Sequence, residues 1–193
     1  MDWGNEEYYK RFESKLEPFK NKTNKILELG AYRGDSSKFF SDKFLDKKTS
    51  ELHCVDTWKG SVEYDEDFKA NEKEFKKKIK ESKHPDKVKI HKKTTFNFFI
   101  DHFKEKKKPY FNLIYIDACH DGRCVISDAI NSFKALKLEG YIVFDDYNWK
   151  INKHDYERPK LAIDSFIKLF RDNIKIISKG YKMYIQKIKE YEF

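Results

Sequence analysis

The sequence is poor in cysteine, proline and glycine, and it has no long apolar run. Its 193 residues include three cysteines, Cys54, Cys119 and Cys124, which form no C-x-x-C pair and leave one over in any pairing scheme. This pattern favours reduced thiols in a cytosol-like compartment. No stretch of about 18 apolar residues is present, and the first residues lack the apolar core of a signal peptide. We therefore expect a cytoplasmic protein with no membrane partner.

Arginine is also scarce, although the chain is basic. Lys and Arg together number 41 against 33 Asp and Glu, which gives a net charge of +8, but nearly all of these cations are lysines. The lysine runs FKKKIKESK and FKEKKKP fall in predicted helix faces or tails. Arginine is the residue suited to bidentate phosphate contacts, so this pattern indicates a solvated surface. We expect no nucleic-acid partner.

The chain is built from short apolar runs that alternate with longer amphipathic segments. This alternation is typical of a parallel sheet covered by helices. The predicted strands are residues 25–29, 51–55, 88–91, 112–117 and 140–144. The predicted helices between them are residues 36–47, 67–82, 95–106 and 123–136.

The two ends of the chain differ from this pattern. After a predicted helix at residues 158–172, the apolar runs IKIISK and YKMYIQKI are separated only around Lys179 and Gly180, which permits a β-hairpin but no parallel crossover. We therefore predict one α/β domain over residues 1–193, with a Rossmann-like, mostly parallel sheet that ends in an antiparallel hairpin. The segment to about Lys22 is predicted to be helical, with apolar members Trp3, Tyr8, Tyr9, Phe12, Leu16 and Phe19.

A glycine loop follows the first predicted strand, in the sequence ELGAYRGDSSKFF. Gly30 and Gly34 allow a tight turn and a close approach to a ligand, and Ser36 is one of the residues that can cap the next helix. Free amides at that helix start favour an anionic group. The alternative is a strand-to-helix turn that needs glycine only for its geometry.

An acidic residue, Asp56, ends the second predicted strand about 20 residues after this loop. In doubly wound folds a carboxylate in that place accepts hydrogen bonds from ribose hydroxyls, so a nucleoside-containing cofactor is indicated. Tyr32 stands where a dinucleotide fingerprint would need its second glycine. NAD and FAD are disfavoured, whereas a smaller ligand with an amino-acid tail would fit.

Five segments taken together resemble a known family. In order along the chain, ILELGAYRGDSSKFF, CVDTW, FNLIYIDACHDG, LKLEGYIVFDDY and RPKLAIDSFI are similar to class I S-adenosylmethionine-dependent methyltransferases. The likeness is closest to the small-molecule branch with macrocin-type sugar O-methyltransferases and covers residue 26 to the C-terminal hairpin.

The resemblance implies a seven-stranded sheet and a set of cofactor residues. It implies that Glu28, Gly30 and Gly34 surround the methionine part of S-adenosylmethionine, and that Asp56 holds the ribose. Further expected cofactor contacts are Ser36, Trp58, Thr94 and Asp117.

Two acidic clusters end neighbouring predicted strands. FNLIYID places Asp117 at the end of one, and GYIVFDDY places Asp145 and Asp146 at the end of the next. The ligand crevice of an open parallel sheet lies outside these carboxyl ends, so the three carboxylates should meet there, with His120 above them.

Three ionised carboxylates in one small space require a cation or shared protons. An oxygen-rich set with open positions suits Mg²⁺, so Asp117, Asp145 and Asp146 are candidate ligands, as the resemblance also implies. His120 is then the candidate general base, because a neutral imidazole accepts a proton near neutral pH. Polar residues in an ordinary loop after a buried strand are the alternative.

The sequence thus predicts an S-adenosylmethionine-dependent enzyme that methylates a hydroxyl of a sugar, nucleotide-sugar or other small molecule with the help of Mg²⁺. Alternatives on the same fold are an N-methyltransferase of a sugar amine and an RNA methyltransferase. A non-catalytic binding module is the alternative of another class. The segment 1–22 is expected to serve as a lid or as the contact of a homodimer.

Overall fold

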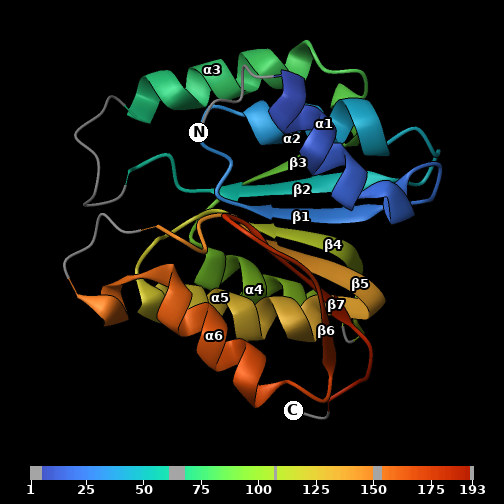
Figure 1. Cartoon of the computed structure of the whole chain (residues 1–193). Helices are drawn as coiled ribbons and strands as arrows, with labels where there is room; N and C mark the ends of the chain where they lie inside the picture. Colours follow the sequence, from blue (N-terminus) through green and yellow to red (C-terminus); the bar gives the residue numbers. More distant parts are fainter. Residues whose placement is uncertain (1–5, 61–67, 107, 150–153, 192–193) are drawn as a thin grey trace.

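A computed structural model of the chain describes residues 6–60, 68–106, 108–149 and 154–191. Seven strands form one sheet in the order β3-β2-β1-β4-β5-β7-β6 (Figure 1). Strands β1 to β5 run parallel, and β7 is antiparallel to both β5 and β6. The strands are β1 Lys25–Leu29, β2 Glu51–Asp56, β3 Val88–Lys92, β4 Phe111–Ile116, β5 Leu136–Phe144, β6 Ile174–Lys179 and β7 Met183–Lys187.

Helices cover both faces of this sheet. Figure 1 shows α1, α2 and α3 on one face and α4, α5 and α6 on the other. The helices are α1 Glu6–Lys15, α2 Asp35–Phe44, α3 Phe68–Lys80, α4 Thr95–Glu105, α5 Gly122–Ala135 and α6 Pro159–Leu169, with short 3₁₀ turns at Glu17–Phe19, Pro85–Lys87 and Asp155–Glu157. The predicted fold class is therefore confirmed, including the antiparallel hairpin. None of the described helices is long and apolar enough to cross a membrane.

The element boundaries depart from the predicted ones mainly at β5. This strand begins at Leu136 rather than at Gly140, because Leu136 already pairs with Phe111 of β4. Residues 137–139, between Leu136 and Gly140, are exposed, so the apolar pattern of the sequence does not indicate the earlier start. At the N-terminus the predicted helix is present over Glu6–Lys15 and ends before the predicted Lys22, because a 3₁₀ turn with Pro18 follows at Glu17–Phe19; Trp3 lies outside the described residues.

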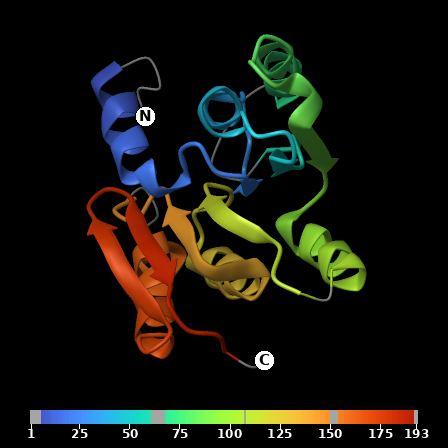
Figure 2. The ribbon, with the colours of Figure 1, turned by 90° about the vertical axis from the view of Figure 1, so that its right-hand side faces the viewer.

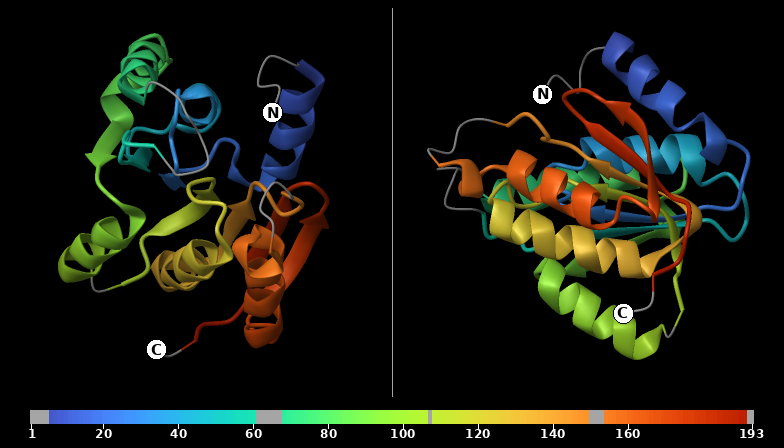
Figure 3. Two further views of the ribbon diagram at one scale, coloured as in Figure 1. Left: turned by 90° about the vertical axis from the view of Figure 1, so that its left-hand side faces the viewer. Right: turned by 60° about the horizontal axis from the view of Figure 1, so that its bottom comes forward.

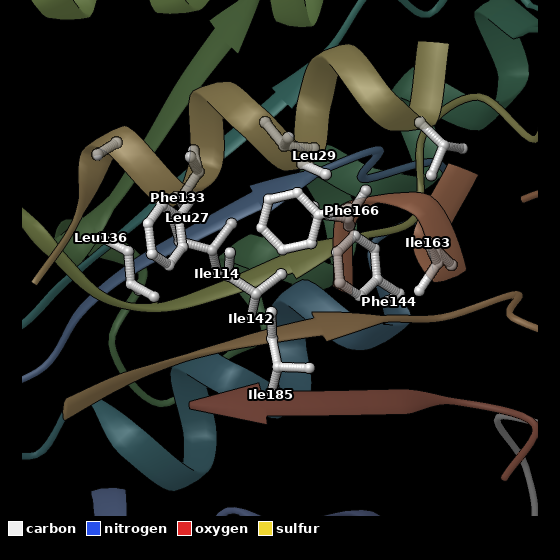
Figure 4. Packing of buried hydrophobic residues seen from close by; sticks show 14 of the residues in the cluster. Leu27, Leu29, Ile114, Phe133, Leu136, Ile142, Phe144, Ile163, Phe166 and Ile185 are labelled. Atoms are coloured by element: carbon white, nitrogen blue, oxygen red, sulfur yellow. The ribbon is translucent and has the colours of Figure 1, made fainter. Parts of the chain in front are cut away.

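Two apolar layers lie on the two faces of the sheet. The layer beneath α5 and α6 contains Leu27, Ile114, Phe133, Ile142 and Phe166 (Figure 4). The opposite layer is largely aromatic, since Phe12 of α1 packs against Phe39 and Phe40 of α2 and against Tyr115 of β4. Figures 2 and 3 show α1 close to the tip of the β6–β7 hairpin, and the Phe12 and Tyr184 ring centroids are 6.4 Å apart.

Backbone hydrogen bonds continue the parallel ladder beyond the strand ends. Gly30 N donates to Val55 O at 2.9 Å, Asp117 N to Leu29 O at 2.8 Å, and Asp145 N to Ile116 O at 3.0 Å. The segments after β1, β4 and β5 are thereby held at one edge of the sheet. This is the edge where open α/β sheets bind ligands.

Candidate active site

The loop after β1 is shaped by two glycines with positive φ. Gly30 has φ +86°, and a Cβ added there would lie 2.0 Å from the carbonyl oxygen of Asp117. Gly34 has φ +83°, and its added Cβ would lie 2.9 Å from the ring of Phe75. Only glycine therefore lets the loop lie against the end of β4. The strand-to-helix geometry expected from the sequence is present.

The carboxylate of Asp56 holds this loop in place. Its Oδ2 accepts hydrogen bonds from the amides of Ala31 and Tyr32 at 3.0 and 2.9 Å, and its Oδ1 accepts from the amide of Trp58 at 2.7 Å. The Trp58 side chain is buried and donates from Nε1 to the Tyr32 carbonyl at 2.9 Å, and its ring packs in a tilted arrangement on Phe75 with 4.9 Å between the centroids. Both residues thus position the glycine loop, a role that sequence reasoning did not assign to them.

Glu28 lies inside the protein rather than on an open surface. The side chain is fully buried, and the hydroxyls of Ser36 and Ser37 at the start of α2 donate to its carboxylate. Burial raises the pKa of Glu28 to about 7, although these hydroxyls and Cys54 act in the opposite direction. Glu28 and Ser36 therefore join β1 to α2 beneath the loop. Thr94, another expected cofactor contact, caps α4 by accepting from the Asn97 amide at 3.2 Å.

The ends of β4 and β5 bring together Asp117, His120 and Asp146. One donor atom from each of these side chains lies within 4.8 Å of the others. The His120 Nε2 is 2.9 Å from Asp146 Oδ2 and 3.9 Å from Asp117 Oδ1. Beneath them is a cavity of about 10 Å³, which these residues line together with Cys119 and Asp145. That volume suits about one water molecule or ion.

The two carboxylates change the proton affinity of the imidazole. Burial lowers the pKa of His120, but hydrogen bonding and charge interaction with Asp117 and Asp146 outweigh it and raise the pKa to about 10. Burial raises the pKa of Asp117, because it disfavours the charged carboxylate. His120 is consequently protonated at neutral pH in this arrangement. It can accept a proton only when another cation neutralises the carboxylates.

Asp145 belongs to a different contact, so the predicted group of three carboxylates is assembled only in part. Its side chain is fully buried and is in direct contact with the ammonium of Lys182, which precedes β7. The Lys182 Nζ also donates to the Tyr115 hydroxyl at 3.1 Å. Burial lowers the pKa of Lys182 to about 7, whereas the Asp117 charge acts in the opposite direction. Sequence reasoning missed Lys182, whose only signal was a lysine among the apolar residues of YKMYIQKI.

Helix α1 reaches this edge through Tyr8. Burial raises the pKa of the Tyr8 phenol far above its usual value, and the nearby charges of Asp117 and Asp146 add to this effect. Tyr8 also lies over the Lys182 ammonium, with 5.4 Å from Nζ to the ring centroid. The N-terminal helix, which the sequence left as a lid or dimer contact, therefore forms part of the wall around the acidic residues.

Trp149, after β5, lies against the base candidate. Its ring stacks on the His120 imidazole with 4.5 Å between centroids, and its buried Nε1 has no hydrogen-bond partner among the described residues. Beside it is a groove of about 250 Å³. The groove is lined by Asn148, Trp149, Asp155, Arg158, Lys160, Leu161 and Asp164.

Two other aromatic residues that follow β5 take different places. Tyr147 is buried and donates to Asp164 at 2.7 Å, while Tyr156 is half exposed and stacks on His154. A Cβ on Gly122 would lie 2.5 Å from the Tyr156 carbonyl oxygen, so glycine there lets the segment before α6 approach the start of α5.

Several solved structures have the same fold. An O-methyltransferase from Bacillus cereus in complex with SAH has 17% sequence identity and a TM-score of 0.66, covering 96% of this chain and 82% of that one. The MycE methyltransferase of the mycinamycin biosynthetic pathway, in complex with Mg, SAH and mycinamycin VI, has 14% identity and a TM-score of 0.63. That match covers 93% of this chain and 49% of MycE.

A third structure, described as a candidate rRNA methylase from Clostridium thermocellum, has 13% identity and a TM-score of 0.68. It covers 94% of this chain and 96% of that one. At these identities the likeness shows the fold alone. A search of the curated proteins gives no match.

A family model described as a methyltransferase domain matches residues 27–147, from β1 to the segment after β5. This range is more than half of the chain and contains the glycine loop, Asp56 and the acidic residues described above. The chain therefore belongs to the methyltransferase-domain family and has the class I fold that the sequence predicted.

Proposed function

We propose that this protein transfers a methyl group from S-adenosylmethionine to a hydroxyl of a sugar or other small molecule. The observation that carries the proposal is the grouping of Asp117, His120 and Asp146 at the edge of the sheet next to the glycine loop. A hydroxyl is a weak nucleophile until it loses its proton, so an acceptor needs a base and a neighbouring positive charge.

The cofactor is proposed to lie across the ends of β1 and β2. Gly30 and Gly34 give it access to the loop backbone, Asp56 accepts from the ribose, and Asp117 borders the methionine end. Glu28, Ser36 and Trp58 act by positioning the loop, because their polar side-chain groups are bound inside the protein. Thr94 lies at the start of α4 and is the most distant along the chain from the glycine loop among these residues apart from Asp117. The SAH in the B. cereus structure supports S-adenosylmethionine as the cofactor.

A divalent cation fits the acidic residues. Two carboxylates and an imidazole converge on a cavity the size of one ion, and uncompensated carboxylates at this distance repel one another. Asp117 and Asp146 are the proposed ligands, and Asp145, the third predicted ligand, borders the same cavity. Mg²⁺ bound there would orient an acceptor hydroxyl and lower its pKa. The Mg in the MycE complex supports the choice of this metal.

His120 is the proposed general base. Its Nε2 faces the space between the two carboxylates, and the Trp149 ring holds the imidazole plane. The neutral imidazole accepts the hydroxyl proton while the acceptor oxygen attacks the sulfonium methyl and the carbon–sulfur bond breaks. The electrons of that bond stay on sulfur, so the cofactor leaves as a neutral thioether. Because this is a good leaving group, direct transfer requires no covalent enzyme intermediate.

The groove beside Trp149 is the proposed acceptor site. An aromatic ring next to polar side chains suits the face and the hydroxyls of a sugar. The complex of MycE with mycinamycin VI supports a small-molecule acceptor. The rRNA methylase candidate keeps an RNA acceptor as the second possibility on this fold.

Calorimetric titration with S-adenosylmethionine, with and without Mg²⁺, tests the proposal. We expect micromolar cofactor binding, and methyl transfer from labelled donor to a member of a panel of sugars and nucleotide-sugars. The His120→Asn variant should retain cofactor binding and lose at least 100-fold in turnover. Absence of cofactor binding by the folded protein would refute the proposal, and transfer only to RNA would refute its acceptor class.

A further inference from the structure

Lys182 is a buried lysine in the β6–β7 hairpin, and only 8% of its surface is exposed. Strand β7 pairs antiparallel to β5 with Met183 opposite Phe144. The next residues, Lys182 and Asp145, consequently face each other just beyond the two strands. The hairpin thereby delivers a cation to the edge of the sheet where the acidic residues gather.

The surroundings of this lysine exclude water. Its Nζ lies 5.4 Å from the ring centroids of Tyr8 and Phe12 in α1 and 5.2 Å from that of Tyr115 in β4. These rings supply cation–π contacts but no countercharge. Burial alone disfavours the charged form of Lys182, but the fully buried Asp145 carboxylate touches the Lys182 ammonium directly and favours that form.

Asp145 nonetheless borders the cavity that Asp117, His120 and Asp146 share. A carboxylate bound to an ammonium in a dry environment is a poor ligand for a second cation, because the ion pair must first be broken. We propose that the Lys182 ammonium, by pairing with Asp145, prevents this carboxylate from coordinating a divalent ion. Lys182 thereby lowers the affinity of the acidic site for metal.

This inference rests on the proposed function, since it concerns the metal proposed for the same site. Without Lys182, Asp145 would become a third carboxylate beside the cavity and the local charge would fall by one unit. Both changes favour a divalent cation. Lys182 is thus a positioning residue for Asp145, and it limits the site to the ligands Asp117 and Asp146 with His120 beside them.

Metal binding can be measured directly by calorimetric titration with Mg²⁺ and by the electron paramagnetic resonance signal of free Mn²⁺. We expect the Lys182→Met variant to bind both ions at least ten-fold tighter than the unmodified protein. Lys187→Met is the matched control, because Lys187 is an equally buried lysine of β7 that donates to the carbonyls of Phe133 and Leu136. Its metal affinity should stay within two-fold.

The Lys182→Met variant leaves a buried carboxylate without its partner and can fail to fold, so a second variant is needed. The double variant Lys182→Met with Asp145→Asn removes both charges and keeps the net charge. If Asp145 is kept from the metal, this variant binds Mn²⁺ within three-fold of the unmodified protein. A loss of ten-fold or more would identify Asp145 as a ligand and overturn the inference.

A folded Lys182→Met variant that binds metal no tighter would also overturn it. Titration of the same variants with S-adenosylmethionine separates this inference from the proposed function. Cofactor binding with unchanged metal affinity would contradict only the role of Lys182, whereas loss of cofactor binding in the unmodified protein would contradict the proposed function.

Discussion

At the scale of single residues, the glycine loop shows how a backbone requirement supports a site. Gly30 combines a positive φ with an approach to the Asp117 carbonyl that leaves no room for a Cβ. Asp117 is at the same time a proposed ligand. A change at Gly30 should therefore disturb the fold and the acidic residues together.

We predict that Gly30→Ala destabilises the protein by about 3 kcal/mol or more, since it adds both a steric clash and backbone strain. Urea unfolding followed by circular dichroism measures this free energy. Gly180→Ala is the control, because the nearest atom to its added Cβ is 3.9 Å away, and its effect should stay within about 0.5 kcal/mol. Equal stability of the two variants would show that the loop can relax.

The candidate residues themselves could be predicted because parallel strands end at one edge. Asp117, Asp145 and Asp146 were placed there from their position after buried strands, and the structure puts them there. The partner of Asp145 could not be predicted. Lys182 lies beside Asp145 because β5 pairs with β7. Local periodicity does not indicate which strand, distant in the sequence, a given strand pairs with.

At the scale of the elements, α1 connects the N-terminal segment to the site. Phe12 is buried, and its ring lies 5.2 Å from that of Phe39 and 5.8 Å from that of Tyr115. The amphipathic pattern predicted this helix, because Tyr8 and Phe12 are spaced by four residues and lie on one face. The pattern did not say which face of the sheet it would cover, since many apolar surfaces accept an aromatic stripe.

We predict that Phe12→Ala destabilises the protein by about 3–4 kcal/mol through the cavity it leaves. The same variant should weaken the enclosure of Lys182, whose Nζ lies over this ring. Phe96→Ala is the control, because Phe96 is 62% exposed and its truncation should cost less than about 1 kcal/mol. Thermal unfolding by calorimetry compares them, and a comparable loss in both variants would contradict the packing role of α1.

At the scale of the whole molecule, buried titratable groups act in opposite directions as the pH falls. Burial lowers the pKa of His53 and of His102 to about 4, so both are neutral in the folded state at neutral pH. Burial raises the pKa of Glu28 to about 7 and that of Asp128 to about 6. The unfolded chain binds more protons at the two histidines but fewer at the two carboxyls, so the total pH dependence of stability is a difference between the two effects.

A single histidine can be isolated from this sum. His102 is stacked on Phe98 and Phe111, so phenylalanine fits in its place. The contribution of the neutral His102 to the free energy of unfolding is fully present above pH 6.5. It is lost as the pH falls toward 4, because His102 in the unfolded state takes up a proton at higher pH than in the folded state. Between pH 7.5 and 4.5, His102→Phe should therefore lose about 1–3 kcal/mol less free energy of unfolding than the unmodified protein.

Guanidinium unfolding at several pH values measures this difference. His154→Gln is the control, because His154 is exposed and should leave the slope unchanged. Parallel pH profiles for His102→Phe and the unmodified protein would mean that His102 is already accessible to protons in the folded state. A free energy of unfolding that falls less with pH in His102→Phe than in the unmodified protein would instead establish that His102, buried between α4 and β4, makes this fold sensitive to acid. This sensitivity would be independent of any chemistry at the acidic site.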